Sequence, residues 1–388
     1  MRDGLGRRPF FGALIDGNGV IEEVWPRSPA DAVGLQPGDR VVSIDAVPVR
    51  SPEQVSERLA THRLGELATL VLSRQGELRI GPLVIAPRPR ETVDGAEVVL
   101  GDVTVGGIRQ RTILVKPDGV ARPPIVLVLG GLATESIDYF PPRPTPIAQL
   151  VAALARAGIA SLRIEKRGVG DSEGGPPEDV DFDSEGAAAR AALDALASGR
   201  VIDHDGIVLF GHSMGGMLAP LLAAERVRGI VAYGTWAGRF TDAMIASLQR
   251  QRVGRDDANE LDAALLRAVV EGDERLDDVL EARPELAGAP SFGEGRLFGR
   301  TVQYFRQLQR HDLRQAWRSA AVPALLLHGE HDHVTTLEDH VAIAEELARM
   351  DIVAHATELP GFAHDMSGPD GTVARETIAF VHSVCGGD

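Results

Sequence analysis

The feature that most limits the fold of this chain is an alternation of short apolar runs with helical segments. The run IVLVL at 125–129 is apolar at every position, and GIVLF at 206–210 and PALLLHG at 323–329 are similar. Strands that are apolar on both faces are typical of a parallel sheet covered by helices on both sides. Helical patterns at 145–157 and 184–198 lie between these runs. The order predicts an α/β fold with a mostly parallel sheet.

Two changes in composition and apolar periodicity divide the chain. The stretch PRPRE at 87–91 is proline-rich, charged and without an apolar period, so it predicts a linker. The residues before it contain short β-type runs and short helices, which predict a small β-rich domain over 1–90. Residues 91–388 then form the α/β domain. Within it, the helical and charged stretch at about 236–318 predicts an inserted helical cap.

Composition excludes several classes of partner. The formal net charge is −16, and an acidic surface repels nucleic acid and anionic lipid. The single cysteine, Cys385, allows neither an internal disulfide nor a thiolate metal site. No apolar run is long enough for a membrane span and no secretory signal is evident, which predicts a cytoplasmic location. Only two lysines occur, Lys116 and Lys166, and we attribute that scarcity first to coding bias.

The sequence LFGHSMGGM at 209–217 follows an apolar strand and opens a helix. Its Gly-x-Ser-x-Gly pattern suits a sharp strand-to-helix turn that lifts a serine hydroxyl above the sheet. The pattern predicts Ser213 as a nucleophile, with the N-terminus of the helix facing a developing oxyanion. His212 is expected to pack and to form a local hydrogen bond, not to act as a base. The alternative is a glycine-rich turn with an incidental serine.

A serine hydroxyl is a weak nucleophile and needs a base. In folds with such a turn, the acid and then the histidine follow the serine along the chain. Asp332 comes just after the run at 323–329, and His364 comes just after the last predicted strand. We therefore predict Asp332 as the orienting acid and His364 as the base. The alternatives are a turn cap for Asp332, a core histidine for His364, and a metal site at 331–333, although adjacent side chains there diverge. Asp365 is not chosen as the acid because its side chain is expected to point away from the neighbouring His364.

The loop GGLATES at 130–136 follows the first central strand. In folds with this turn, one backbone N–H of that loop and the N–H after the nucleophile bind the oxyanion. We assign these roles to Leu132 and Met214. Glycines at the start of the loop allow the backbone to approach a substrate closely. The alternative is an ordinary turn.

These stretches resemble the α/β-hydrolase superfamily, in particular a bacterial esterase-like branch related to prolyl-oligopeptidase-type hydrolases. The resemblance covers about 95–388, is weakest across 236–318, and implies the α/β-hydrolase fold without a cofactor or metal. Glu165 stands where an aspartate is usual, and Gly130 where many members have histidine. The matching stretches are VLVLGGLATES, ARAGIASLRIEKRGVGDSEG, VIDHDGIVLFGHSMGGMLAP and PALLLHGEHD.

The resemblance also implies that the inserted cap lies over Ser213 and shapes an acyl pocket. The candidate pocket residues are Trp236, Phe240 and Met244, followed by Phe292, Phe298, Tyr304 and Phe305. A core internal to the cap is an equally good interpretation of each of these residues.

The N-terminal part resembles PDZ domains of the bacterial protease-associated kind. The resemblance rests on SPADAVGLQPGDRVVSIDAVPV at 28–49 and on the loop Phe11-Gly12-Ala13. In that family the backbone N–H groups of the loop capture a C-terminal carboxylate, and the peptide adds as a strand. The implied partner is a peptide or protein C-terminus. The alternative is a packing or dimerisation module.

The sequence thus predicts a serine hydrolase that cleaves a small-molecule ester or thioester through an acyl-enzyme. A peptidase, or an acyltransferase or cyclase, could use the same residues. The PDZ-like domain favours a peptidase, whereas the lack of a large propeller counts against an oligopeptidase. The alternative of another class is a non-catalytic binding protein that works through the PDZ-like domain.

Overall fold

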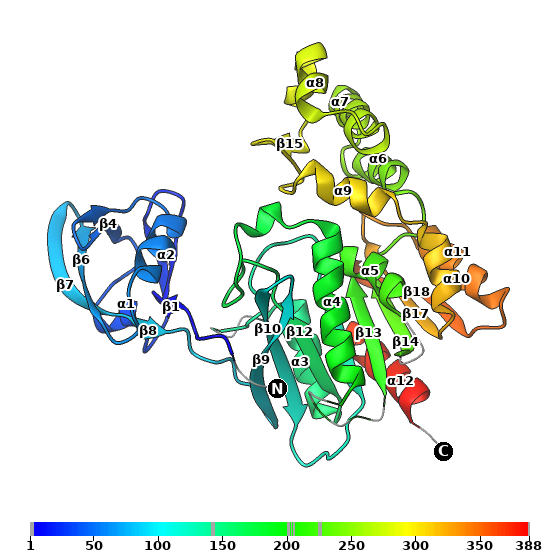
Figure 1. Ribbon diagram of the computed structural model, residues 1–388, viewed down its shortest axis with the longest axis horizontal. Helices are drawn as coiled ribbons and strands as arrows, with labels where there is room; N and C mark the ends of the chain where they lie inside the picture. Colours follow the sequence, from blue (N-terminus) through cyan, green and yellow to red (C-terminus); the bar gives the residue numbers. More distant parts are fainter. Residues whose placement is uncertain are drawn as a thin grey trace. The chain divides into compact units, whose positions relative to one another are not determined.

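The computed structural model describes residues 4–140, 144–199, 202, 204, 206–223 and 227–386. The chain forms two compact units. The smaller contains Gly6–Glu91 together with Phe140, and the larger contains residues 4–5, Thr92–Tyr139 and the described chain from residue 144 onward (Figure 1). Each unit has its own apolar core.

The larger unit is built on an eight-stranded sheet with the order β18-β17-β14-β13-β11-β12-β10-β9. β10 is antiparallel to both β9 and β12, and the other neighbouring pairs are parallel, which confirms the predicted mostly parallel sheet. The strands are β9 (Ala96–Val105), β10 (Ile108–Pro117), β11 (Ile125–Leu129), β12 (Ala160–Ile164), β13 (Ile207–His212), β14 (Val227–Tyr233), β17 (Ala324–His331) and β18 (Ala354–Ala363).

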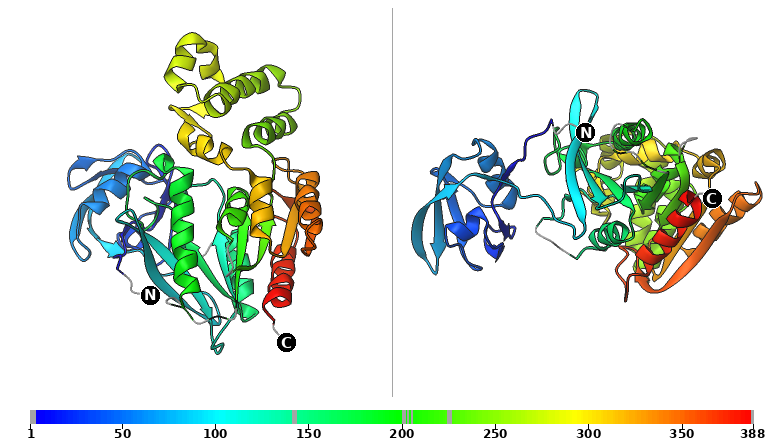
Figure 2. Two further views of the ribbon diagram at one scale, coloured as in Figure 1. Left: turned by 45° about the vertical axis from the view of Figure 1, so that its right-hand side comes forward. Right: turned by 90° about the horizontal axis from the view of Figure 1, so that it is seen from below.

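Helices cover both faces of this sheet (Figures 1 and 2). One face packs against α3 (Pro146–Arg156) and α12 (Thr372–Cys385), and the other against α4 (Phe182–Ala197), α5 (Met214–Leu222), α10 (Leu313–Ala320) and α11 (Leu337–Ala348). Along β11, Ile125 and Leu127 join the core on one face, whereas Val126 and Val128 join the core on the other. This alternation explains why the strand is apolar at every position.

A helical segment is inserted between β14 and β17. Its centre is aromatic: the rings of Phe240 and Phe305 stack with centroids 5.0 Å apart, and Trp236 lies beside Phe240 at 6.3 Å. Its elements are α6 (Phe240–Gln251), α7 (Asp256–Leu266), a π-helical turn at Arg267–Glu271, α8 (Leu276–Ala282), a 3-10 turn at Pro284–Gly288, β15 (Phe292–Gly293), β16 (Arg296–Leu297) and α9 (Val302–Gln309).

The smaller unit holds a four-stranded antiparallel sheet with the order β5-β4-β6-β7 and two strand pairs, β2 with β3 and β1 with β8. Its two helices each begin with a serine cap and a proline in the first turn, at Ser28 and Ser51. The elements are β1 (Pro9–Phe10), β2 (Ala13–Ile15), β3 (Ile21–Val24), α1 (Pro29–Ala32), β4 (Arg40–Ile44), β5 (Val47–Pro48), α2 (Pro52–Ala60), β6 (Leu67–Arg74), β7 (Glu77–Val84) and β8 (Ala86–Pro87).

The predicted linker begins inside the smaller unit. Pro87 pairs with Pro9 in the β1–β8 ladder, and the Arg88 N–H donates to the Arg8 carbonyl at 3.0 Å. Proline is tolerated at such a sheet edge because it has no N–H to leave unpaired. Phe140 belongs to the same unit and packs edge-on against the ring of Phe10, with centroids 5.7 Å apart. A contact between residues so distant in sequence leaves no local pattern.

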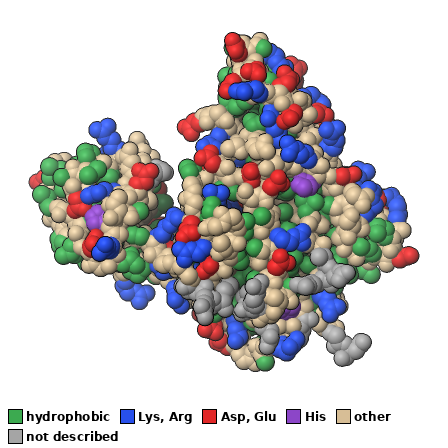
Figure 3. Space-filling view, in the orientation of Figure 1, with side chains coloured by type: hydrophobic (Ala, Val, Ile, Leu, Met, Phe, Trp, Pro, Cys, Tyr) green, Lys and Arg blue, Asp and Glu red, His purple; other side chains and the backbone are tan. Residues whose placement is uncertain are grey.

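The helices and the surface add two observations about partners. Within the part of the chain that is described, no helix is long and apolar enough to cross a bilayer. On the face that Figure 3 draws, the side chains of Lys and Arg are interspersed with those of Asp and Glu and do not gather into one broad basic area.

Candidate active site

Ser213 lies at the sharp turn between β13 and α5. Its φ of 53° is positive, a conformation that is costly for a residue with a side chain and that gathers at functional sites. The Ser213 N–H donates to the Tyr233 carbonyl at 2.9 Å, which fixes the turn against β14. A Cβ at Gly211 would lie 2.4 Å from the Gly215 oxygen, and one at Gly215 would lie 2.1 Å from the Leu129 oxygen. The flanking glycines are therefore required by close backbone packing.

Asp332 and His364 follow two residues that pair across the sheet. His331 at the end of β17 is the partner of Ala363 at the end of β18. Because paired residues on neighbouring strands lie about 5 Å apart, the residues that follow them start side by side. The strand register thus brings together an acid and a histidine that are far apart in sequence.

A bulge makes this register possible. Gly329 pairs with Leu359, and the next pair is His331 with Ala363. The pairing thus advances by two residues along β17 and by four residues along β18. Gly361 lies in the bulge with a φ of 74°, and its N–H donates to the Glu330 carboxylate at 2.8 Å. The Pro-Gly pair at 360–361 lies in this bulge, and the strand continues to Ala363.

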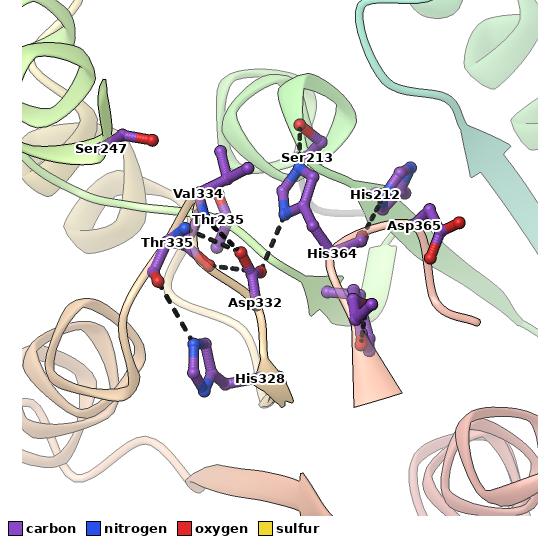
Figure 4. A network of polar contacts seen from close by, with 12 residues as sticks. His212, Ser213, Thr235, Ser247, His328, Asp332, Val334, Thr335, His364 and Asp365 are labelled. Atoms are coloured by element: carbon purple, nitrogen blue, oxygen red, sulfur yellow. Dashed lines mark hydrogen bonds and ion pairs between the residues drawn. The ribbon is translucent and has the colours of Figure 1, made fainter. Parts of the chain in front are cut away.

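The three side chains form one hydrogen-bonded row (Figure 4). His364 Nε2 lies 3.0 Å from Ser213 Oγ, and His364 Nδ1 lies 2.8 Å from Asp332 Oδ2. The His364 side chain is 23% exposed and that of Asp332 is fully buried. With Nδ1–H donating to the carboxylate, Nε2 is left to accept the serine proton.

Asp332 is held in its charged form. Its Oδ1 accepts the N–H groups of Val334 at 2.7 Å and Thr335 at 2.9 Å, and its Oδ2 accepts the Thr335 hydroxyl at 2.8 Å. Burial by itself would raise the pKa of Asp332, but the hydrogen bonds from His364 and Thr335 and the charge of His364 together bring that pKa well below its usual value. A charged acceptor in this position fixes the orientation of the imidazole.

Of the two predicted oxyanion donors, Met214 follows Ser213 in the chain and Leu132 belongs to a loop that approaches it. Met214 is the first residue of α5, so its N–H has no acceptor within the helix. On the other side, a Cβ at Gly131 would lie 3.5 Å from the Ser213 Cβ, which brings the loop that carries Leu132 against the nucleophile. The roles of both N–H groups remain predictions.

A family model described as serine aminopeptidase S33 matches residues 145–368, more than half of the 388-residue chain. The chain belongs to this family of α/β hydrolases. A PDZ domain model matches residues 20–74 of the same hydrolase. Both family resemblances drawn from the sequence, and the α/β-hydrolase fold with an N-terminal β-rich PDZ region, are therefore confirmed.

Solved structures share the fold of this hydrolase. Est1E from Butyrivibrio proteoclasticus with bound ferulic acid has a TM-score of 0.52 at 18% identity, over 74% of this chain and 99% of that one. The complex of DcsB with its substrate analogue has a TM-score of 0.51 at 18% identity, over 75% and 100%. A puromycin-hydrolyzing peptidase of Mycobacterium tuberculosis has a TM-score of 0.50 at 14% identity, over 84% and 45%.

Similarity to curated proteins is confined to a short stretch. The magnetosome formation protease MamE of Paramagnetospirillum magneticum is 40% identical over 72 residues, which are 18% of this chain and 10% of that protein. The MamE of Magnetospirillum gryphiswaldense is 35% identical over 72 residues. The hydrolase thus spans about a tenth of the length of the curated relatives it matches.

His212 contacts the backbone of the predicted base. Its Nε2–H donates to the His364 carbonyl at 2.7 Å, so the hydrogen bond that was expected to be local reaches a distant segment. Burial, and then the charge of His364, lower the pKa of His212 to about 4. A neutral ring whose Nε2–H donates to this carbonyl can steady the loop of His364, and its lowered pKa makes it a weak base.

A second histidine supports the acid from behind and was missed in the sequence. His340 on α11 donates from Nδ1 to the Thr336 carbonyl at 2.7 Å and accepts the Thr235 N–H at Nε2 at 3.2 Å. Thr235 follows Gly234, where a Cβ would lie 2.9 Å from His364 Nδ1 and 3.0 Å from Asp332 Oδ2. One buried ring therefore joins the two loops that enclose the His364–Asp332 pair.

Replacing His340 by glutamine is expected to weaken the acid sensitivity of folding. Burial lowers the pKa of His340 from 6.5 to about 4, so the unfolded chain takes up a proton at a higher pH than the folded chain does. The stabilisation from the neutral ring is complete above pH 6.5 and is lost as the pH falls toward 4. The urea midpoint of the wild type should therefore drop between about pH 7.5 and about pH 5, and that of His340→Gln should drop less.

The exposed His355 provides a matched control, because His355→Gln removes a histidine from the surface. An equal drop in the wild type and in His340→Gln would contradict a role for His340 in this pH dependence.

The predicted pocket residues pack within the inserted segment. Trp236 and Phe240 are each only 2% exposed, and Met244 lies partly buried against the same apolar core. These observations agree with the core interpretation, and the acyl-pocket role of the three remains a prediction. Among the described residues, no group of three or more His, Cys, Asp or Glu side chains could hold a metal ion.

A further group beside the predicted oxyanion loop was also missed. Lys166 Nζ donates to the carbonyls of Gly131 at 2.7 Å and Leu132 at 3.2 Å. The signal that could have identified it is rarity, because Lys166 is one of only two lysines in the chain. Arg300 of the inserted segment also donates to the Leu132 carbonyl, but it is one of many arginines and carries no such signal.

Proposed function

We propose that this hydrolase cleaves a carboxylic ester or thioester by nucleophilic catalysis at Ser213. The observation that carries the proposal is the row of hydrogen bonds from Ser213 Oγ through His364 to Asp332, at 3.0 and 2.8 Å. A hydroxyl, an imidazole and a buried carboxylate in this order are what acyl transfer through a serine requires.

In the proposed reaction His364 Nε2 takes the proton of Ser213 as Oγ attacks the carbonyl carbon of the substrate. The charge on the resulting oxyanion is received by the N–H groups of Leu132 and Met214, and Asp332 stabilises the imidazolium. His364 then returns the proton to the leaving group, which departs and leaves an acyl group on Ser213. Water, deprotonated by His364, attacks this ester and releases the acid.

Such a site cleaves an ester or thioester more readily than an amide. An alkoxide or thiolate leaves more readily than an amine, which must be protonated as it departs. The family model is named for an aminopeptidase, and the similar structures include one with ferulic acid and one of a puromycin-hydrolyzing peptidase. The fold therefore supports both kinds of chemistry, and peptidase activity is the second candidate; transfer of the acyl group to a nucleophile other than water is a variant of the first.

A substrate panel separates the two. We expect p-nitrophenyl esters of graded acyl length to be hydrolysed faster than aminoacyl and peptidyl p-nitroanilides, with kcat/KM ratios above about tenfold. Rapid cleavage of an anilide with negligible ester turnover would overturn the preference for esters. Added alcohols or amines that divert the acyl group from water would indicate a transferase.

We further propose that the PDZ domain binds a peptide C-terminus at Phe11, Gly12 and Ala13. Gly12 has a φ of 86°, and its carbonyl accepts the N–H of Trp25 at 3.0 Å. Because a trans peptide directs its C=O and N–H to opposite sides, the Ala13 N–H faces away from Trp25. That orientation supports capture of a carboxylate, while use of the domain for packing, the non-catalytic alternative and the cytoplasmic location remain untested predictions.

A further inference from the structure

Two cations, one partly buried and one buried, hold the loop that carries Leu132. Lys166, which follows β12, reaches the carbonyls of Gly131 and Leu132 with the same ammonium group, at 2.7 and 3.2 Å. Arg300, from the inserted segment, donates to the Leu132 carbonyl at 3.2 Å. The Lys166 side chain is 16% exposed and that of Arg300 is 1% exposed. Both contacts are therefore largely shielded from water.

One carboxylate holds the two cations together. Glu185 on α4 lies 3.3 Å from Lys166 Nζ and accepts a hydrogen bond from Arg300 Nη2. Its other oxygen accepts the hydroxyl of Tyr304 at 3.1 Å, and the Arg300 guanidinium lies 4.4 Å from the centre of the Tyr304 ring. Burial lowers the pKa of Lys166, and the charge of Glu185 opposes that shift. The carboxylate thus helps to keep the ammonium charged where it meets the loop.

The geometry of the peptide group connects these contacts with catalysis. The Gly131 carbonyl and the Leu132 N–H belong to the same peptide, and in a trans peptide they point in opposite directions. A group that fixes the carbonyl on one side therefore sets the direction of the N–H on the other. A cation on the carbonyl oxygen also polarises the amide, which strengthens its N–H as a donor.

We infer that Lys166 is a positioning residue for the oxyanion hole, which it aims by anchoring the Gly131–Leu132 peptide, with Glu185 and Arg300 completing the anchor. The inference rests on the proposed function, because it requires the Leu132 N–H to receive the oxyanion. It assigns a catalytic consequence to a lysine that touches neither the substrate nor the reacting atoms. It also gives the inserted segment a direct connection, through Arg300, to the loop beside Ser213.

The test replaces Lys166 by methionine, which fills a similar volume without a charge or a donor. A cavity of about 60 Å³ borders Lys166, Gly130 and Glu185, so a smaller residue would also add empty space. Because a small misplacement of a catalytic group can cost about 10²-fold in rate, we expect kcat for a p-nitrophenyl ester to fall by about that factor. KM should change by no more than about twofold, since the lost interaction is realised only in the transition state.

Two further measurements distinguish aiming from general damage. The affinity for a trifluoromethyl ketone, which forms a tetrahedral oxyanion adduct on serine, should fall in parallel with kcat/KM. The dissociation constant of the intact ester, measured in the Ser213→Ala background, should be the same with Lys166 and with methionine. Lys116→Met, at the only other lysine and near the end of β10, the second strand from the sheet edge, is the matched control and should leave kcat unchanged.

The outcomes are separable. If the wild type hydrolyses the ester and the kcat of Lys166→Met is within about threefold of the wild-type kcat, the inference is overturned. A decrease in rate that is matched by an equal decrease in affinity for the ester would also overturn it. If Lys166→Met does not fold, Arg300→Met is measured in the same way. Its kcat is expected to fall by about tenfold, because Arg300 is one of two donors to the Leu132 carbonyl. A folded wild type that neither turns over esters nor reacts with a fluorophosphonate would overturn the proposed function and this inference with it.

Discussion

Ser213→Ala is expected to lower kcat for an ester by about 10⁶-fold, because removal of the nucleophile of a hydrogen-bonded serine site abolishes the acyl-enzyme route. The residual rate should come from the backbone donors and from substrate binding alone. KM should remain close to the wild-type value, since Ser213 Oγ contributes little to ground-state binding. Initial rates with a p-nitrophenyl ester at high enzyme concentration measure the difference.

Ser319→Ala is the control for that experiment, because Ser319 is an exposed serine on α10. Its kcat should match that of the wild type. A Ser213→Ala variant that retains more than about a tenth of the wild-type kcat would be incompatible with covalent catalysis at this position.

Asp332→Asn should have the second largest effect, a decrease in kcat of about 10⁴-fold. An amide at this position can donate to His364 Nδ1, which moves the ring proton to Nε2 and leaves that nitrogen unable to accept the proton of Ser213. The shape of the site is preserved, so the loss reflects the wrong tautomer rather than a cavity. Kinetics with the same ester, with thermal melting as a check on folding, measures it.

The same substitution has a predicted effect on stability. The pKa of Asp332 is lowered in the folded state, so its charged form stabilises the fold fully above the ordinary carboxyl pKa of about 4 and loses this effect as the pH falls further. The wild type should therefore exceed Asp332→Asn in stability near neutral pH, and the difference should narrow in acid. Asp365→Asn, at the neighbouring acid whose side chain caps Ser367, is the control and should retain most of the activity.

Patterns that are local in sequence predicted the sheet and the sharp strand-to-helix turn at Ser213. Runs such as IVLVL are apolar throughout because alternate residues enter the cores on opposite faces, and Gly211 and Gly215 are required within one turn. The order of the late strands was sufficient to select Asp332 and His364, because the carboxyl ends of parallel strands meet at one edge of the sheet. The smaller unit was recognisable from its loop and helix-start residues.

The supporting contacts could not be predicted because each depends on the three-dimensional register of distant segments. The bulge at Gly361 that aligns Ala363 with His331 follows a Pro-Gly pair that is also typical of a turn. His340 is an ordinary helical residue until α11 brings it against Thr235. Arg300 reaches Leu132 only because the inserted segment folds back toward the sheet.

The most direct test of the central claim is to map the site at which a fluorophosphonate reacts with the folded protein. Ser213 is activated by His364, whereas an ordinary serine has no such base, so one adduct per chain is expected. Intact mass should show a single addition, and tandem mass spectrometry should locate it on Ser213. An adduct on another residue, or a fully folded protein that does not react, would contradict the claim that Ser213 is the nucleophile.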